Sequence, residues 1–157
     1  MTIQRRVMLC IVLGCLLLAG CSAGSSEPNV IVSGFAHATA AEHTDDLVDN
    51  TVVGGVFLSI ENHSSFSVRL MSATTSTAST IELHQSRVEN DVMRMGQVEG
   101  GIEIAANSTL DFEDEGYHLM LMELTDELVA GDVIEVTLTF TRENGEPFEV
   151  SASVTVD

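Results

Sequence analysis

Apolar and polar residues alternate in short runs along most of the chain. Between Val133 and Phe140, the even-numbered residues are all apolar and most odd-numbered ones are polar or charged. Because successive side chains of a β-strand point to opposite faces, this pattern predicts a strand with one buried and one solvent-facing side. Such runs occur at residues 30–35, 51–62, 65–73, 79–86, 101–105, 108–113, 116–124, 132–144 and 147–156. The pattern therefore predicts about eight or nine short strands.

Turn-forming residues separate these runs. Asn144–Gly145, between two alternating runs, is typical of a tight β-hairpin. Only residues 124–131 suggest any helix, a single short turn that Thr125 would cap. Without long helices to cover a parallel sheet, the simplest architecture is an all-β antiparallel sandwich.

The first twenty residues differ in composition from the rest. Arg5 and Arg6 precede an apolar run that is shorter than the ~20 residues of a membrane span, which is the pattern of a secretion signal. Leu18–Cys21 resembles a bacterial lipobox, in which the cysteine is acylated and anchors the protein outside the cytoplasm. An ordinary signal peptide and a short transmembrane anchor are the alternatives. We therefore predict a signal peptide at 1–20, lipidated Cys21 and a flexible tether at 21–29, and one domain at 30–157.

Charge and cysteine content exclude several functions. All 24 acidic residues but only four of the six basic ones follow residue 20, so the formal charge is −18 for the whole chain and −20 without the signal. Nucleic acid is excluded as a partner, because phosphate binding requires clustered Lys and Arg. Cys10 and Cys15 leave with the signal and Cys21 carries lipid, so the domain has neither a disulfide nor a thiolate. Without a thiolate or an evident nucleophile beside a histidine, we expect that the protein is not an enzyme.

Histidine and methionine alternate in the strand predicted at 116–124. Its residues His118, Met120 and Met122 would share one face. A second group upstream contains His84, Met93 and Met95. Thioether and imidazole donors without thiolates suit Cu(I) outside the cell and bind Zn(II), Mg(II) or Ca(II) poorly. The alternative is that the methionines only fill gaps in the core.

The combined spacing of these residues resembles the PCuAC family of periplasmic and extracytoplasmic copper chaperones. Ten residues separate His84 from Met95, and 22 separate Met95 from His118, which begins the motif His-Leu-Met. The resemblance implies a cupredoxin-like fold, an antiparallel Greek-key β-sandwich. It also implies one Cu(I) bound by His84, Met95, His118 and Met120. The second interval is one residue longer than the family usually has, and we place the extra residue at Gly100–Gly101.

The resemblance also implies a function in copper carriage. The recipient would be a haem-copper oxidase subunit or a thiol-bearing assembly factor, reached from a lipid anchor in the membrane. Copper storage or detoxification would use the same site. A structural or adhesive surface lipoprotein, whose methionines merely pack, is the alternative from a different class.

Four further residues are auxiliary candidates. Met93 and Met122 each share a strand face with a proposed ligand. His37 and His43 lie in an acidic segment and are candidates for a second, weaker site that would take Cu(II). His63 is interpreted as a turn residue.

Overall fold

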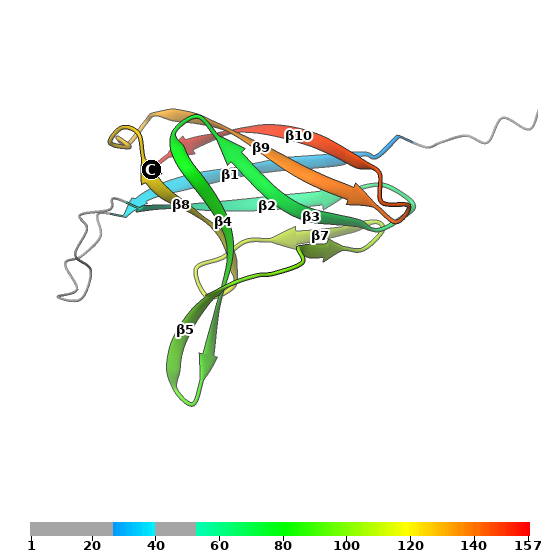
Figure 1. The fold of residues 1–157 in the computed structure, drawn as a ribbon, viewed down its shortest axis with the longest axis horizontal. Helices are drawn as coiled ribbons and strands as arrows, with labels where there is room; N and C mark the ends of the chain where they lie inside the picture. The colour runs from blue at the N-terminus through cyan, green and yellow to red at the C-terminus, as the bar shows by residue number, and fades with distance from the viewer. Residues whose placement is uncertain (1–26, 40–52) are drawn as a thin grey trace, which may run out of the picture.

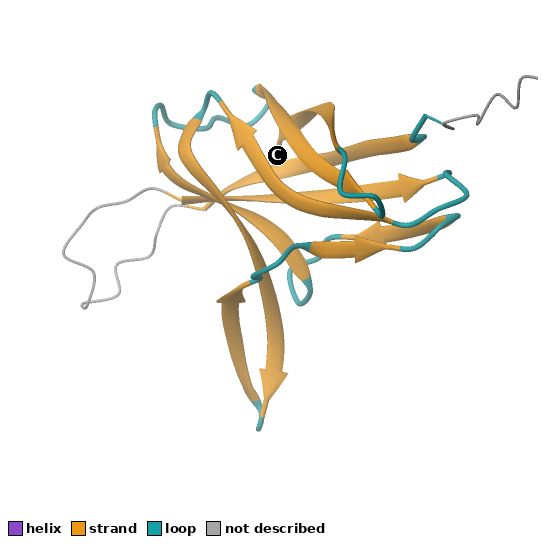
Figure 2. Cartoon of the chain, turned by 45° about the vertical axis from the view of Figure 1, so that its right-hand side comes forward, coloured by secondary structure: helices purple, strands orange, loops and turns teal. Residues whose placement is uncertain are grey.

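The computed structural model describes residues 27–39 and 53–157, in which every regular element is a β-strand (Figure 1; Figure 2). The strands are β1 (Val30–Thr39), β2 (Val53–Asn62), β3 (Val68–Thr75), β4 (Ala78–Glu89), β5 (Val92–Gln97), β6 (Ile102–Ile104), β7 (Ser108–Asp111), β8 (Tyr117–Leu124), β9 (Val133–Arg142) and β10 (Pro147–Val156). The predicted all-β class is confirmed. Within the described residues, no helix of membrane-spanning length and apolarity is present. The signal peptide at 1–20, Cys21 and His43 lie outside these residues.

The strands form one continuous sheet. Its two halves, which meet at the β1–β10 pair, share a core. The strand order is β5-β4-β8-β2-β1-β10-β9-β3-β6, and β7 pairs with β2 beside this path. Every pair is antiparallel except β1 with β10, which run parallel at Phe35 and Ala36. The sequence had predicted antiparallel pairing throughout. The parallel pair joins strands from opposite ends of the described chain, so no short turn imposes an antiparallel direction on it.

The core follows the alternation read from the sequence. From Ile134 to Phe140, the four even-numbered residues of β9 are all 5% exposed or less. They belong to one cluster with Val56 of β2 and Leu119 of β8, so both halves of the sheet contribute to it. Fully burying side chains of this size contributes about 1.5–3 kcal/mol each.

The β4–β5 hairpin projects away from the sandwich (Figure 1; Figure 2). At its tip Asn90 and Asp91 both have positive φ, 54° and 62°, between the paired residues Glu89 and Val92. Two positive φ values in a two-residue loop are the mark of a type I′ turn, whose twist matches that of the strands. The sequence had indicated only an extended segment here.

The helical turn expected at 124–131 does not form. Residues 125 and 126 make a bend, and the Thr125 hydroxyl donates to the Thr77 carbonyl, 3.1 Å away, instead of capping a helix. Thr125 therefore ties the end of β8 to the turn between β3 and β4.

Candidate metal centre

The predicted ligands lie on one face of three adjacent strands, β5, β4 and β8. His84 of β4 is directly opposite His118 of β8. Met120 lies two residues beyond His118 and opposite Glu82. Met95 of β5 is opposite Ser86, which is two residues from His84. Because directly paired residues point to the same side of a sheet and residues two apart share a face, all four candidate side chains project from the same surface.

The register separates the nearer methionines from the farther ones. Met120 and Met95 are each one diagonal step from His84, a Cα distance of roughly 7–8 Å that long side chains can cross. Met122 and Met93 lie two residues further along the same strands, about 7 Å more distant. Met120 is half-buried, whereas Met95 on the hairpin is 52% exposed and lies two strands from His118. The fold thus brings the two histidines and Met120 together, with Met95 on the open side.

The two imidazoles each leave one nitrogen without a partner. Their ring centroids are 5.9 Å apart at an interplanar angle of 62°. His84 Nε2 is 2.8 Å from Glu82 Oε2, and His118 Nδ1 is 3.3 Å from the Gly116 carbonyl oxygen. Among the residues that the structure describes, the remaining nitrogens, His84 Nδ1 and His118 Nε2, are buried and have no hydrogen-bond partner. Such unpaired buried polar atoms are uncommon in folded proteins, and a bound ion is one arrangement that would satisfy both of them.

The ring separation fits a shared metal ion. With metal–nitrogen bonds of about 2 Å, two imidazoles on one ion hold their ring centroids within roughly 6.5 Å of each other. The observed 5.9 Å lies inside this limit. Among the described residues, no three His, Cys, Asp or Glu side chains are grouped to hold a metal ion. The methionines on the same face offer thioether sulfurs as further donors, and donors of this soft kind favour Cu(I).

Phe57 and the turn before β8 bury His118. The centroid of the Phe57 ring is 6.2 Å from that of the His118 ring. A Cβ placed on Gly55 would come within 3.2 Å of the Phe57 ring. Gly55 pairs with Met120, so its lack of a side chain leaves room for Phe57 beside the site. His118 is 4% exposed. Burial lowers the pKa of His118 below its ordinary value of 6.5, and a smaller effect of His84 acts in the same direction. His118 consequently offers a neutral nitrogen over a wider pH range than a free histidine.

The other histidines lie apart from this pair. His37 Nδ1 is 2.7 Å from Asp157 Oδ1 on the exposed side of β1, where the His37 ring also packs against Phe57 at 5.7 Å. Its proposed companion at a second site, His43, lies outside the described residues. His63 follows β2 and pairs with Glu61 at 2.9 Å, as expected of a turn residue.

Two residues of the site were missed by sequence reasoning. Glu82 has a signal in the sequence, since it precedes His84 by two positions in a strand and must share its face. Phe57 has none, because its contact with His118 depends on how β2 pairs with β8.

Comparison with known protein families identifies the family of this chain. The family described as "Putative lipoprotein LpqE-like" matches residues 31–154. The chain belongs to this family. A relative in the same class, "Putative lipoprotein Lxx21020" of Leifsonia xyli subsp. xyli (strain CTCB07), is 36% identical over 94 residues. That match covers 60% of this chain and 57% of the relative, so it spans less than two thirds of the relative's length. Both descriptions are of lipoproteins, the class that Leu18–Cys21 predicts.

Solved structures with the same fold as this LpqE-like chain include PCuAC domains. The "Copper-bound PCuAC domain from PmoF2" has a TM-score of 0.56 and 16% sequence identity, covering 82% of this chain and 93% of its own. The "Solution structure of CuI-DR1885 from Deinococcus radiodurans" has a TM-score of 0.55 and 23% identity, covering 86% and 83%. At these identities the likeness establishes the fold. The predicted PCuAC resemblance and cupredoxin-like architecture are thereby confirmed.

Proposed function

We propose that this protein is an extracytoplasmic copper chaperone that holds one Cu(I) between His84, Met95, His118 and Met120. The observation that carries the proposal is the pair of buried nitrogens, His84 Nδ1 and His118 Nε2, that face no hydrogen-bond partner on two directly opposed strands. Solved domains of the same fold that are described as copper-bound add support.

The donor set suits reversible carriage. Imidazole and thioether are neutral, so the bound ion keeps its single positive charge and is held less tightly than by thiolates. The buried His118 is the fixed end of the site, whereas Met95 is exposed on the hairpin. An incoming donor from a recipient would therefore replace Met95 first and His118 last, and copper would pass by stepwise ligand exchange. We infer carriage and not catalysis, so no reaction is assigned to the histidines.

The proposed lipid anchor would be attached through the start of β1, which lies far from the site along that strand. His37 of β1 pairs with Gly55, which in turn pairs with Met120. Val30, where the tether enters β1, lies seven residues before His37, roughly 23 Å along the strand. A lipid on Cys21 would thus be linked to the domain at the end of β1 that is distant from the copper-binding residues, and these residues would stay accessible to a recipient. This arrangement suits a membrane-bound recipient whose copper domain projects from the bilayer, such as a haem-copper oxidase subunit or its thiol-bearing assembly factor.

The test is an anaerobic competition between the chain from residue 22 onward and a chromogenic Cu(I) chelator. We expect one equivalent of Cu(I), with the affinity lowered at least tenfold in His84→Ala and in Met120→Leu. Met71→Leu is the control, because Met71 is an exposed methionine on β3 in the other half of the sheet and its loss should change nothing. If the wild-type chain does not compete for Cu(I), the chaperone function is wrong.

A further inference from the structure

We propose that Glu82 is a positioning residue that holds His84 with its Nδ1 nitrogen free and aimed at the copper, a role that rests on the proposed copper function. Glu82 is not one of the residues expected to bind the metal. It acts on copper through His84, by fixing which nitrogen carries the proton and how the ring is turned.

The hydrogen bond between the two side chains sets the protonation pattern. Glu82 Oε2 lies 2.8 Å from His84 Nε2. An ionised carboxylate only accepts hydrogen bonds, so Nε2 must carry the hydrogen and donate it. In the neutral ring, Nδ1 then holds the lone pair. Nδ1 is also the buried nitrogen without a hydrogen-bond partner, so the geometry and the protonation pattern select the same atom.

His118 is oriented by a different device. Its Nδ1 lies 3.3 Å from the Gly116 carbonyl, which only accepts, and its Nε2 is the unpartnered nitrogen. The two rings therefore present opposite nitrogens, Nδ1 from His84 and Nε2 from His118. For His118 a backbone carbonyl determines which nitrogen is protonated, whereas for His84 a side chain determines it. Only the Glu82 side chain can be removed by a substitution that leaves the proposed ligands unchanged.

The carboxylate also strengthens the donor. A negative charge on the hydrogen-bonded side of an imidazole raises the basicity of its other nitrogen and restricts rotation of the ring. The Glu82 side chain is 33% exposed and that of His84 only 15%, so the contact is shielded more than a surface pair. Loss of such a partner typically costs 10–100-fold in metal affinity.

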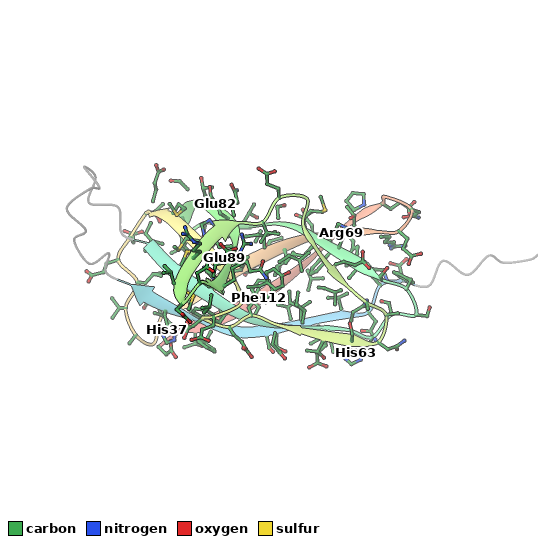
Figure 3. All side chains as sticks on the ribbon, turned by 90° about the horizontal axis from the view of Figure 1, so that it is seen from below. His37, His63, Arg69, Glu82, Glu89 and Phe112 are labelled. Atoms are coloured by element: carbon green, nitrogen blue, oxygen red, sulfur yellow. The ribbon has the colours of Figure 1, made fainter. Side chains whose placement is uncertain are left out.

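The chain contains a matched control pair. Glu61 and His63 have the same spacing and the same contact, His63 Nε2 to Glu61 Oε2 at 2.9 Å. Both side chains are more exposed, 44% for Glu61 and 48% for His63. Figure 3 shows His63 near one end of the molecule and Glu82 well apart from it. Glu61→Gln therefore removes the same charge from the same kind of contact without touching the site.

The experiment compares Glu82→Gln and Glu82→Leu with Glu61→Gln and the wild type. The first readout needs no copper: long-range ¹H–¹⁵N spectra of the metal-free chain from residue 22 identify which nitrogen of His84 is protonated. We expect His84 to be protonated at Nε2 alone in the wild type and Glu61→Gln, and at either nitrogen once Glu82 is replaced. The second readout is Cu(I) affinity, expected to fall 10–100-fold in both Glu82 variants and to stay within twofold in Glu61→Gln.

The outcomes separate this inference from the proposed function. Protonation of wild-type His84 at Nδ1 overturns the role of Glu82, whatever copper does. Wild-type Cu(I) binding with unchanged affinity in both Glu82 variants also overturns it, while the chaperone function stands. If the wild type binds no Cu(I), the proposed function fails, and with it the copper role of Glu82. Unchanged thermal unfolding of the Glu82 variants, expected for a partly exposed side chain, shows that any affinity loss is local.

Discussion

His84 and His118 face each other across the β4–β8 pair, with ring centroids 5.9 Å apart and one unpartnered buried nitrogen on each ring. Neighbouring strands lie about 4.8 Å apart, so the spacing follows directly from their pairing. The pair forms the core of the proposed copper site.

The first prediction separates two methionines of the hairpin. Met95→Leu should weaken Cu(I) binding at least tenfold, because Met95 is one diagonal step from His84. Met93→Leu should change it less than threefold, because Met93 lies two residues further along β5. Both methionines are about half exposed, so neither substitution should affect folding, and the chelator competition reads the difference directly. Equal effects from the two variants would contradict the register-based assignment.

The second prediction concerns the stability of the metal-free protein against pH. Burial lowers the pKa of His118 below 6.5, so between the lowered value and 6.5 the unfolded chain binds more protons than the folded one. The contribution of His118 to the free energy of unfolding should therefore rise with pH across this window and be complete above it. Below the lowered pKa it is fully lost.

The measurement is urea unfolding of the wild type and His118→Gln at several pH values. The difference in unfolding free energy, wild type minus variant, should increase from the acid side towards pH 6.5 and then level off. A difference that decreases as the pH rises would show that His118 gains a proton on folding, contrary to its burial.

The third prediction assigns the burial of His118 to Phe57. Phe57→Ala should return the pKa of His118 towards 6.5, because removing the ring lets water reach the imidazole. It should also cost about 3 kcal/mol of stability, as a large buried side chain is lost. Phe148→Ala is the control, since Phe148 packs on Phe140 in the other half of the sheet. Titration of His118 by NMR should be unchanged in that variant.

The fourth prediction concerns the end of the sandwich far from the site. Asn62 is 1% exposed; its amide nitrogen donates to the carbonyls of Phe66, Ile104 and Ala105, and its Oδ1 accepts from the Ser64 N–H. Asn62→Leu should destabilise the domain by about 3 kcal/mol, because several buried backbone groups lose their partner. Urea unfolding measures this loss.

The matched control for Asn62 is an exposed asparagine. Asn144 makes two hydrogen bonds with Glu146, donating to its carboxylate and accepting from its N–H, but it lies in the exposed turn between β9 and β10. Asn144→Ala should cost about 1 kcal/mol or less, since water replaces its contacts. A similar loss in both variants would mean that burial does not govern the Asn62 contribution.

Local pattern was enough to predict most strands. The alternation in β9 predicted the buried side chains from Ile134 to Phe140 correctly, because period-two alternation has the same meaning wherever a strand is half-buried. Asn144–Gly145 lies in the turn between β9 and β10. Gly145 has a positive φ of 84°, the left-handed conformation that glycine commonly adopts in a hairpin loop. The turn at Asn90–Asp91 was missed, because both residues tolerate positive φ without signalling it as strongly as glycine.

The sequence by itself determined the all-β class, the likeness to PCuAC domains and the choice of histidines and methionines as candidate ligands, because these depend on residue types and spacings along the chain. Only the tertiary structure decided that His84 lies opposite His118, that Phe57 packs beside His118 and that β1 runs parallel to β10. Which nitrogen of each ring is left free was decided there too, by Glu82 for one and the Gly116 carbonyl for the other. The physical reason is that strand register is set by packing between segments distant in sequence, and a shift of one residue would turn every side chain of a strand to the other face.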